Sequence, residues 1–168
     1  MSTDNILNLG DDQLANQYIV LFPTGIPGGG NTDTISLRMD QSFDPPEETV
    51  NTYDIIFQGL KITKTGMLTE TTKEFTIDIR LDQQWKVFDD LNNWFKKVYD
   101  PIKGTALPDI MVRTTVVIQY QDGQNKVVKN MRFTGVKIKS LKVGTADHTS
   151  GDPIRLTLGF IYVDKIEE

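Results

Sequence analysis

The sequence predicts a single domain over residues 1–168 that is mainly β with one α-helix (an α+β fold). Its curved antiparallel sheets are expected to form a β-sandwich or barrel. Three observations support this. Most apolar side chains recur at every second position, the period of a strand with one buried face. One segment has helical periodicity instead. The 168 residues contain no cysteine but are long enough to bury a core without disulfides.

The first part of the chain contains short candidate strands. Alternating segments predict strands over 18–22, 34–39 and 52–57, the last continuing past Gly59 towards Thr65. The connecting segments are rich in turn-forming residues, which predicts surface loops; these segments are 23–32, expected to be a flexible hairpin loop, and 40–49.

One strand leads directly into the clearest helix. From Phe75 to Leu81 every odd-numbered residue is apolar and every even-numbered residue is polar, which predicts a strand buried on one face. Asp82 is a suitable N-cap and Asp100-Pro101 ends the next segment, so we predict a helix over 82–99. Its aromatic face is expected to pack against the sheet and is formed by Trp85, Phe88, Leu91, Trp94, Phe95 and Val98.

Long strands close the chain. Alternation predicts strands over 112–120 and 154–162, and the turn Gln121-Asp122-Gly123-Gln124, where Asp-Gly can supply positive φ angles, leads into a strand over about 126–143. In that last strand the apolar parity changes at Gly135 and again around Ser140. Slips of this kind are produced by β-bulges, which bend a strand, so we expect a strongly curved ribbon.

Charge is distributed unevenly along the chain. The net charge is −5, yet residues 1–60 hold nine acidic and one basic side chain, whereas residues 61–168 hold fourteen acidic and seventeen basic ones. This balance disfavours a globally basic nucleic-acid binder. Opposite charges on different faces suit head-to-tail self-association instead.

No catalytic, cofactor or metal site is predicted. Residues 25–32 have the glycine spacing of a P-loop, but Asn31 occupies the lysine position and a strand is expected to follow. His148 is the single histidine and lies in a polar loop, 144–153, that has neither a nucleophile elbow nor the EF-hand spacing. No apolar run has the length of a membrane span, and the acidic, polar N-terminus is unlike a signal peptide, so we expect a soluble protein without a secretory address.

The order of elements is itself informative. An early exposed loop and hairpin are followed by the strand 75–82, by a helix containing Phe88 and Trp94-Phe95, and by antiparallel strands ending with 154–163. This order, over about residues 17–165, resembles the tail tube proteins of contractile-tailed, T4-like bacteriophages. It is similar at one remove to the tube proteins of type VI secretion systems and R-type pyocins.

The resemblance implies a structural virion protein, not an enzyme, with no cofactor. Hexameric rings would stack into the inner tail tube, inside a contractile sheath, and form the conduit for DNA ejection. The implied partners are further copies of the chain, the sheath, baseplate or tube-initiator and terminator proteins, and the tape measure protein and DNA within the lumen. No membrane partner is implied. The tube would belong to the virion and be assembled in the host cytoplasm.

The resemblance also implies contact regions. Residues 40–53 would form the protruding inter-ring loop, and the N-terminal arm 1–16 and the C-terminal tail would lie near inter-ring contacts. We hypothesise that acidic loop residues meet lysines of the next ring; the candidates are Asp40, Phe43, Asp44, Glu47, Glu48, Lys137, Lys139 and Lys142. A net-acidic lumen wall would repel DNA, and the lumen candidates are Ser36, Arg38, Thr76, Asp78 and Arg80, with Asp40.

Alternative functions remain open at this point. A tube-initiator or baseplate hub protein of the same fold would assemble in few copies, and a phage-like contractile injection system would use the same tube. A receptor- or carbohydrate-binding β-sandwich is disfavoured, because Phe43 is the only aromatic residue in loops 23–32, 40–49 and 144–153. An enzyme is disfavoured because the sequence offers no credible nucleophile, metal set or acid–base pair.

Overall fold

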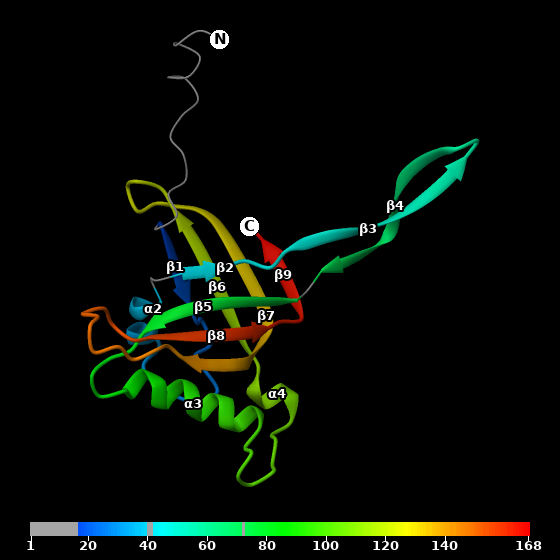
Figure 1. The fold of residues 1–168 in the computed structure, drawn as a ribbon. Coiled ribbons are helices and arrows are strands. Elements are labelled where there is room, and N and C mark those ends of the chain that lie inside the picture. Colours follow the sequence, from blue (N-terminus) through cyan, green and yellow to red (C-terminus); the bar gives the residue numbers. More distant parts are fainter. Residues whose placement is uncertain (1–16, 40–41, 72) are drawn as a thin grey trace.

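The computed structural model describes residues 17–39, 42–71 and 73–168. These residues form a strongly curved antiparallel sheet with a helix below it, and a long hairpin that projects from the sheet (Figure 1). The predicted fold class is confirmed: the chain is mainly β, its sheets are antiparallel, and the main sheet is not closed into a barrel by backbone pairing.

The main sheet has seven strands. Its described path runs β1–β6–β7–β8–β5–β2, and β9 pairs with β7 beside that path. All these pairings are antiparallel. Along this path the strands are β1 (Tyr18–Leu21), β6 (Thr114–Gln121), β7 (Val127–Val143), β8 (Arg155–Ile161), β5 (Glu74–Arg80) and β2 (Ser42–Asp44). The strand beside the path is β9 (Asp164–Glu167).

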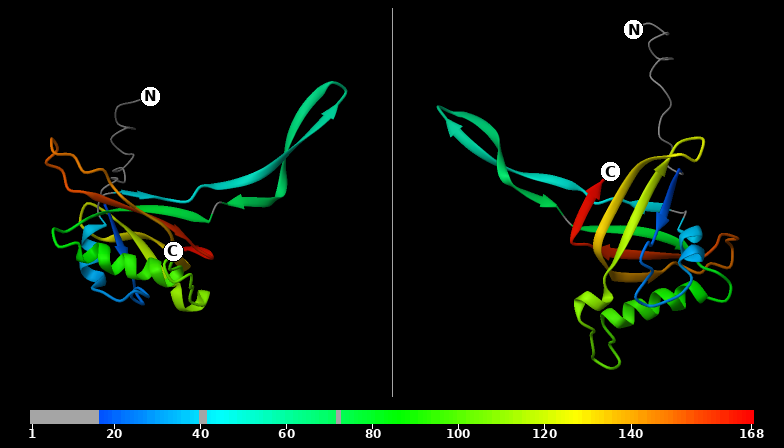
Figure 2. Two further views of the ribbon diagram at one scale, coloured as in Figure 1. Left: turned by 60° about the horizontal axis from the view of Figure 1, so that its bottom comes forward. Right: turned by 180° about the vertical axis from the view of Figure 1, so that it is seen from behind.

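Two bulges bend β7, at the positions that the parity changes predict. The register slips where Thr114 faces Val136 but Val116 faces Phe133, and Gly135 between them has φ 63°. It slips again between Ile138 and Ser140. The first part of β7 therefore pairs with β6 and the last part with β8, so this one strand carries the sheet around its curve (Figure 2).

Side chains bring the two ends of the sheet together where the backbone does not. Tyr18 of β1 and Phe43 of β2 have ring centroids 6.3 Å apart. Phe43 also contacts Phe75 and Phe133 at 5.9 and 6.3 Å, and the Tyr18 hydroxyl donates a hydrogen bond to the Met39 carbonyl at 3.2 Å. The sheet thus curls around an aromatic core without closing.

The helix α3 (Lys86–Val98) covers the apolar core with Val87, Leu91 and Trp94, which are all buried. It begins later than residue 82, yet the Asp82 carboxylate still caps it by accepting the amide hydrogens of Lys86 (3.2 Å) and Val87 (3.3 Å). The two tryptophans differ. Trp94 is fully buried, whereas Trp85 precedes the helix, has φ 58° and is 37% exposed.

A short helix replaces the strand predicted over 34–39. The helix α2 (Thr32–Arg38) begins because the Asn31 side chain accepts the amide hydrogens of Asp33 and Thr34. Ile35 and Met39, four residues apart, are buried, while the intervening Leu37 is 76% exposed. Apolar residues at 35, 37 and 39 fit the alternation of a strand, but the pair at 35 and 39 also fits the i, i+4 spacing of a helix. The alternation was therefore misleading here.

The loop that connects β1 to α2 packs against α3, so the expected flexible loop is not what the structure shows. Ile26 is buried, and the Lys97 ammonium donates a hydrogen bond to the Pro27 carbonyl at 2.6 Å. A similar adjustment occurs before β6: residues 109–112 form the short helix α4 (Asp109–Val112), so the strand begins at Thr114 and not at residue 112.

The hairpin is a separate two-stranded sheet made of β3 (Glu48–Phe57) and β4 (Leu60–Thr71). Its turn residues Gln58 and Gly59 have φ of 49° and 80°, as a tight hairpin turn requires. The β3 strand has 10 residues, so the hairpin extends about 33 Å at roughly 3.3 Å per residue. Both views of Figure 2 show it pointing away from the main sheet.

Candidate functional site

The most distinct features of the described residues are surfaces and networks of polar contacts. The described residues hold no group of three or more His, Asp or Glu side chains placed to bind a metal ion, and within them no helix has the length and apolarity of a membrane span. The loop around His148 lines an open hollow of about 540 Å³. Its Asp147 is engaged by the Thr149 amide and hydroxyl, which hold the pKa of Asp147 below its ordinary value.

The described path of the main sheet ends in an edge strand on each side. In the described topology β1 pairs with β6 alone, and β2 pairs with β5 alone. Each edge strand therefore presents one row of backbone groups that the described strands do not use. Such edges are templates for pairing with another chain unless they are covered.

The hairpin has two chemically different faces. The cross-strand pairs Ile55–Ile62 and Phe57–Leu60, together with Tyr53, lie on one face. We call these five residues the apolar face. The opposite face is polar: Asp54 forms an ion pair with Lys61 at 2.9 Å and accepts a hydrogen bond from the Thr63 hydroxyl at 2.8 Å. The hairpin is therefore amphipathic.

A groove lies between β1 and α2. It has a volume of about 410 Å³ and is lined mainly by apolar side chains, with Asp33 and Ser36 as its polar members. Leu37 and Ile19, which are 76% and 37% exposed, belong to its walls. We call this the β1–α2 groove; its residues are Tyr18, Ile19, Val20, Leu21, Asp33, Ser36, Leu37 and Met39.

The lumen candidates fall on two different elements. Thr76, Asp78 and Arg80 share one face of β5, because they alternate with the buried Phe75, Ile77 and Ile79. On this face the Asp78 carboxylate accepts hydrogen bonds from the hydroxyls of Ser42 (3.2 Å) and Thr157 (2.8 Å). Ser36 and Arg38 instead lie on α2, where Arg38 lines a small pocket with Asp82. The five residues therefore come from two elements, β5 and α2.

An ion pair links the base of the hairpin to the main sheet. Glu48 forms an ion pair with Lys165 of β9, whose side chain is 13% exposed. Lys165 also pairs with Glu167 at 3.0 Å, which in turn pairs with Lys129 at 2.9 Å. The hydrogen bond with Glu48 raises the pKa of Lys165 above its ordinary value, and Lys129, followed by Lys165, lowers the pKa of Glu167.

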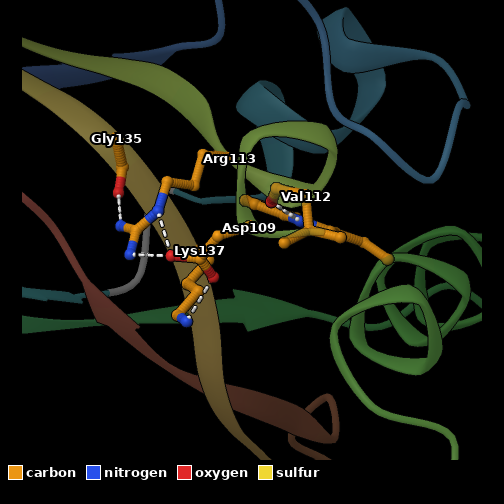
Figure 3. A network of polar contacts seen from close by, with 6 residues as sticks. Asp109, Val112, Arg113, Gly135 and Lys137 are labelled. Atoms are coloured by element: carbon orange, nitrogen blue, oxygen red, sulfur yellow. Dashed lines mark hydrogen bonds and ion pairs between the residues drawn. The ribbon is translucent and has the colours of Figure 1, made fainter. Parts of the chain in front are cut away.

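Lys137 belongs to a second network, which joins α4 to β7 (Figure 3). The Asp109 carboxylate accepts from Lys137 at 2.8 Å and from the Arg113 Nε at 2.9 Å, while Arg113 also donates to the Gly135 carbonyl at 2.5 Å. The hydrogen bond from Lys137, and then that from Arg113, hold the pKa of Asp109 below its ordinary value. Lys139 pairs with Glu74 at 2.5 Å.

The predicted inter-ring residues are therefore in different situations. Asp40 lies outside the described residues, and Phe43 is half-buried in the aromatic core. Glu48, Lys137 and Lys139 already have partners within the chain. The others are exposed and form no ion pair within the described part of the chain; they are Asp44, Glu47 and Lys142. The apolar face was missed, although the alternation of Tyr53, Ile55 and Phe57 already signalled it.

Comparison with known proteins gives a likeness in structure alone. No family model and no curated protein matches the sequence. The fold is similar to a chain of the cryo-EM structure of the anti-feeding prophage baseplate (TM-score 0.68, 10% identity, covering 95% of this chain and 97% of that chain).

Two further solved structures are similar. One is a chain of the sheath–tube complex of an extracellular contractile injection system, PVC, in the extended state (TM-score 0.61, 13% identity, 100% of this chain and 98% of that chain). The other is Hcp1 from Flavobacterium johnsoniae (TM-score 0.53, 12% identity, 90% and 94%). The chain therefore has the fold of the Hcp and tube proteins of contractile injection systems, as the order of its elements predicts.

Proposed function

We propose that this chain is a structural subunit that assembles with copies of itself into the hollow tube of a contractile injection apparatus. The observation that carries the proposal is the open, curved sheet with edges at β1 and β2, in a fold shared with a chain of a sheath–tube complex. Edges of this kind are satisfied when neighbouring copies continue the sheet.

The finer form of the proposal is a hexameric ring that stacks into the tail tube of a contractile phage and conducts DNA during ejection. The sixfold-symmetrised baseplate, the sheath–tube complex and the tube-terminating cap among the similar structures support rings with sheath and terminator partners. Tape measure protein and DNA within the lumen, assembly in the host cytoplasm and incorporation into a virion belong to the same proposal, as does the absence of enzymatic activity.

Two sets of residues are proposed for the assembled tube. Thr76, Asp78 and Arg80 are candidates for the lumen wall, supported by their position on one polar sheet face. Asp44, Glu47 and Lys142 are candidates for charge contacts between rings, supported by their exposure.

A second candidate function is that of a tube initiator in the baseplate, which the similarity to a baseplate chain favours. The two functions differ in how far assembly proceeds. A tube subunit adds rings without limit, because a head-to-tail contact propagates. An initiator stops at one ring.

The test is electron microscopy of the purified full-length protein over a range of concentrations, together with its mass in solution. We expect sixfold rings at low concentration and hollow tubes at high concentration. Rings that never lengthen would assign the initiator role. A monomer at every concentration would contradict both functions.

A further inference from the structure

We propose that the apolar face of the β3–β4 hairpin binds the β1–α2 groove of a second copy of this chain. The inference rests on the proposed self-assembly and deepens it by naming the two surfaces that meet. The contact is also mainly apolar, whereas the sequence analysis expected contacts between acidic residues and lysines.

The apolar face requires a cover. Its residues are substantially exposed: Ile55 38%, Ile62 48%, Tyr53 50%, Phe57 64% and Leu60 68%. A two-stranded hairpin is at best marginally stable in water unless another element packs on its apolar side. Large contiguous apolar patches on a surface mark binding sites.

The described part of the same chain does not supply that cover. The hairpin forms its own sheet, and no described strand of the main sheet pairs with it. Figures 1 and 2 show it projecting on the side away from α2. The described part of the chain therefore leaves the apolar face of this arm, which is about 33 Å long, open to a second molecule.

The β1–α2 groove has the size and chemistry to receive it. Its volume is about 410 Å³, and six of its eight lining residues are apolar or aromatic. Its apolar lining would remain wet in an isolated subunit, because Leu37 is 76% exposed. Burial of both surfaces removes apolar area from water on each partner.

Charge at the margins favours the same pairing. Lys64 lies directly opposite Tyr53, on the same side of the hairpin as the apolar face. Asp33 lies in the wall of the groove. Neither forms an ion pair within the described residues, so each can meet its counterpart across the contact and fix the orientation of the hairpin in the groove.

The contact is head-to-tail and mainly apolar. The hairpin and the groove are different parts of one molecule, so each bound copy leaves a free hairpin or groove for the next and the assembly propagates. Since salt screens exposed charges but not apolar burial, cohesion should persist at high ionic strength.

Because the chain contains no cysteine, introduced pairs report the contact directly. We would mix a Phe57→Cys chain with a size-tagged Leu37→Cys chain under mild oxidation and expect a mixed disulfide dimer. Ile56→Cys, on the polar face, is the matched control and should give much less. A mixed dimer with Ile102→Cys instead of Leu37→Cys would overturn the assignment of the groove.

The second measurement is the concentration at which assembly begins. The double substitution Phe57→Ser and Leu60→Ser should raise it by about 10–100-fold, from the lost burial of two large side chains. Ile56→Ser on the polar face should leave it nearly unchanged. For the wild type, about 1 M salt should not dissolve the assemblies.

The outcomes separate this inference from the proposed function. Assembly of the wild type and of the Phe57/Leu60 variant at the same concentration would overturn the inference and leave the tube function standing. A wild type that never assembles would overturn both. A disulfide within one chain between Leu9→Cys and Leu37→Cys would assign the groove to the N-terminal segment and also overturn the inference.

Discussion

Gly28 shows how closely the β1–α2 loop approaches the helix below it. A Cβ atom at this position would lie 2.7 Å from both the Asp90 carbonyl oxygen and the Trp94 amide nitrogen. Both are backbone atoms of α3, so neither can rotate away. The loop can therefore approach the helix this closely only because residue 28 has no side chain.

We predict that Gly28→Ala lowers the free energy of unfolding by about 1–3 kcal/mol, the usual result of overpacking. Urea denaturation followed by far-ultraviolet circular dichroism measures this. The control is Gly151→Ala, where a Cβ would meet nothing within 4 Å. Equal stability of the two variants would show that the loop moves away from α3 without cost.

Residues of this kind were the hardest to predict. A run of glycines predicts mobility, but the same lack of a Cβ permits close packing, and the sequence does not distinguish the two. The turn before β7 is similar: the Asp-Gly pair predicted positive φ there, but it is Asn125 that has φ 62°. The longer turn places its left-handed residue after the glycine.

At the scale of elements, Asp109 connects two segments that are distant in sequence. Its carboxylate accepts hydrogen bonds from Arg113 beside α4 and from Lys137 on β7. Arg113 in turn reaches the carbonyl of the bulge residue Gly135. The bulge thus has a structural partner as well as a role in bending the strand.

This network predicts a pH dependence of stability. The pKa of Asp109 is lower in the folded protein than its ordinary value of 3.8, so the unfolded chain binds more protons between the two values. The stabilisation is present above pH 3.8 and is lost as pH falls through the lower, folded value. Urea midpoints of the wild type should therefore exceed those of Asp109→Asn near pH 6, and the difference should disappear in acid.

Asp152→Asn, in the exposed loop 144–153, is the matched control and should show no such convergence. A difference between the wild type and Asp109→Asn that stayed constant from pH 6 into acid would mean that the hydrogen-bonding geometry, and not the charge, stabilises the network.

Strands were more predictable than short helices. The alternation in 75–81 and 154–162 predicted β5 and β8 because one face of each strand is buried and the other polar. The parity changes located both bulges. The helix α2 was missed because its seven residues hold only one buried position, Ile35, and its capping residue Asn31 was interpreted as part of a loop.

The whole molecule consists of a curved body and a projecting hairpin whose connection includes the ion pair between Glu48 and Lys165. The sequence predicted the curved body, since bulges are local. It did not predict the extent of the hairpin: residues 40–53 were expected to protrude, whereas Ser42–Asp44 pairs with β5 in the main sheet and the projecting hairpin runs from Glu48 to Thr71. The sequence did not predict the contacts of the candidate site either, because pairs such as Glu48 and Lys165 meet only through the three-dimensional path of the chain.

We predict that Glu48→Gln broadens the range of hairpin orientations while changing overall stability little, because the Glu48 side chain is exposed and Lys165 keeps its ion pair with Glu167. Spin labels on Phe57→Cys and Thr149→Cys would measure the distribution of distances between hairpin and body. Glu47→Gln, one residue earlier and without an ion pair among the described residues, should keep the wild-type distribution. Identical distributions for both variants would assign the orientation to the connecting backbone.

The hairpin shares no backbone pairing with the main sheet, and this separation has a consequence for how such chains diversify. Substitutions between residues 49 and 66 can accumulate without disturbing the aromatic interior, so the proposed docking surface can change while the scaffold stays the same. If the hairpin docks as proposed, a chimaera carrying another subunit's hairpin would keep the architecture of the body and acquire new docking preferences.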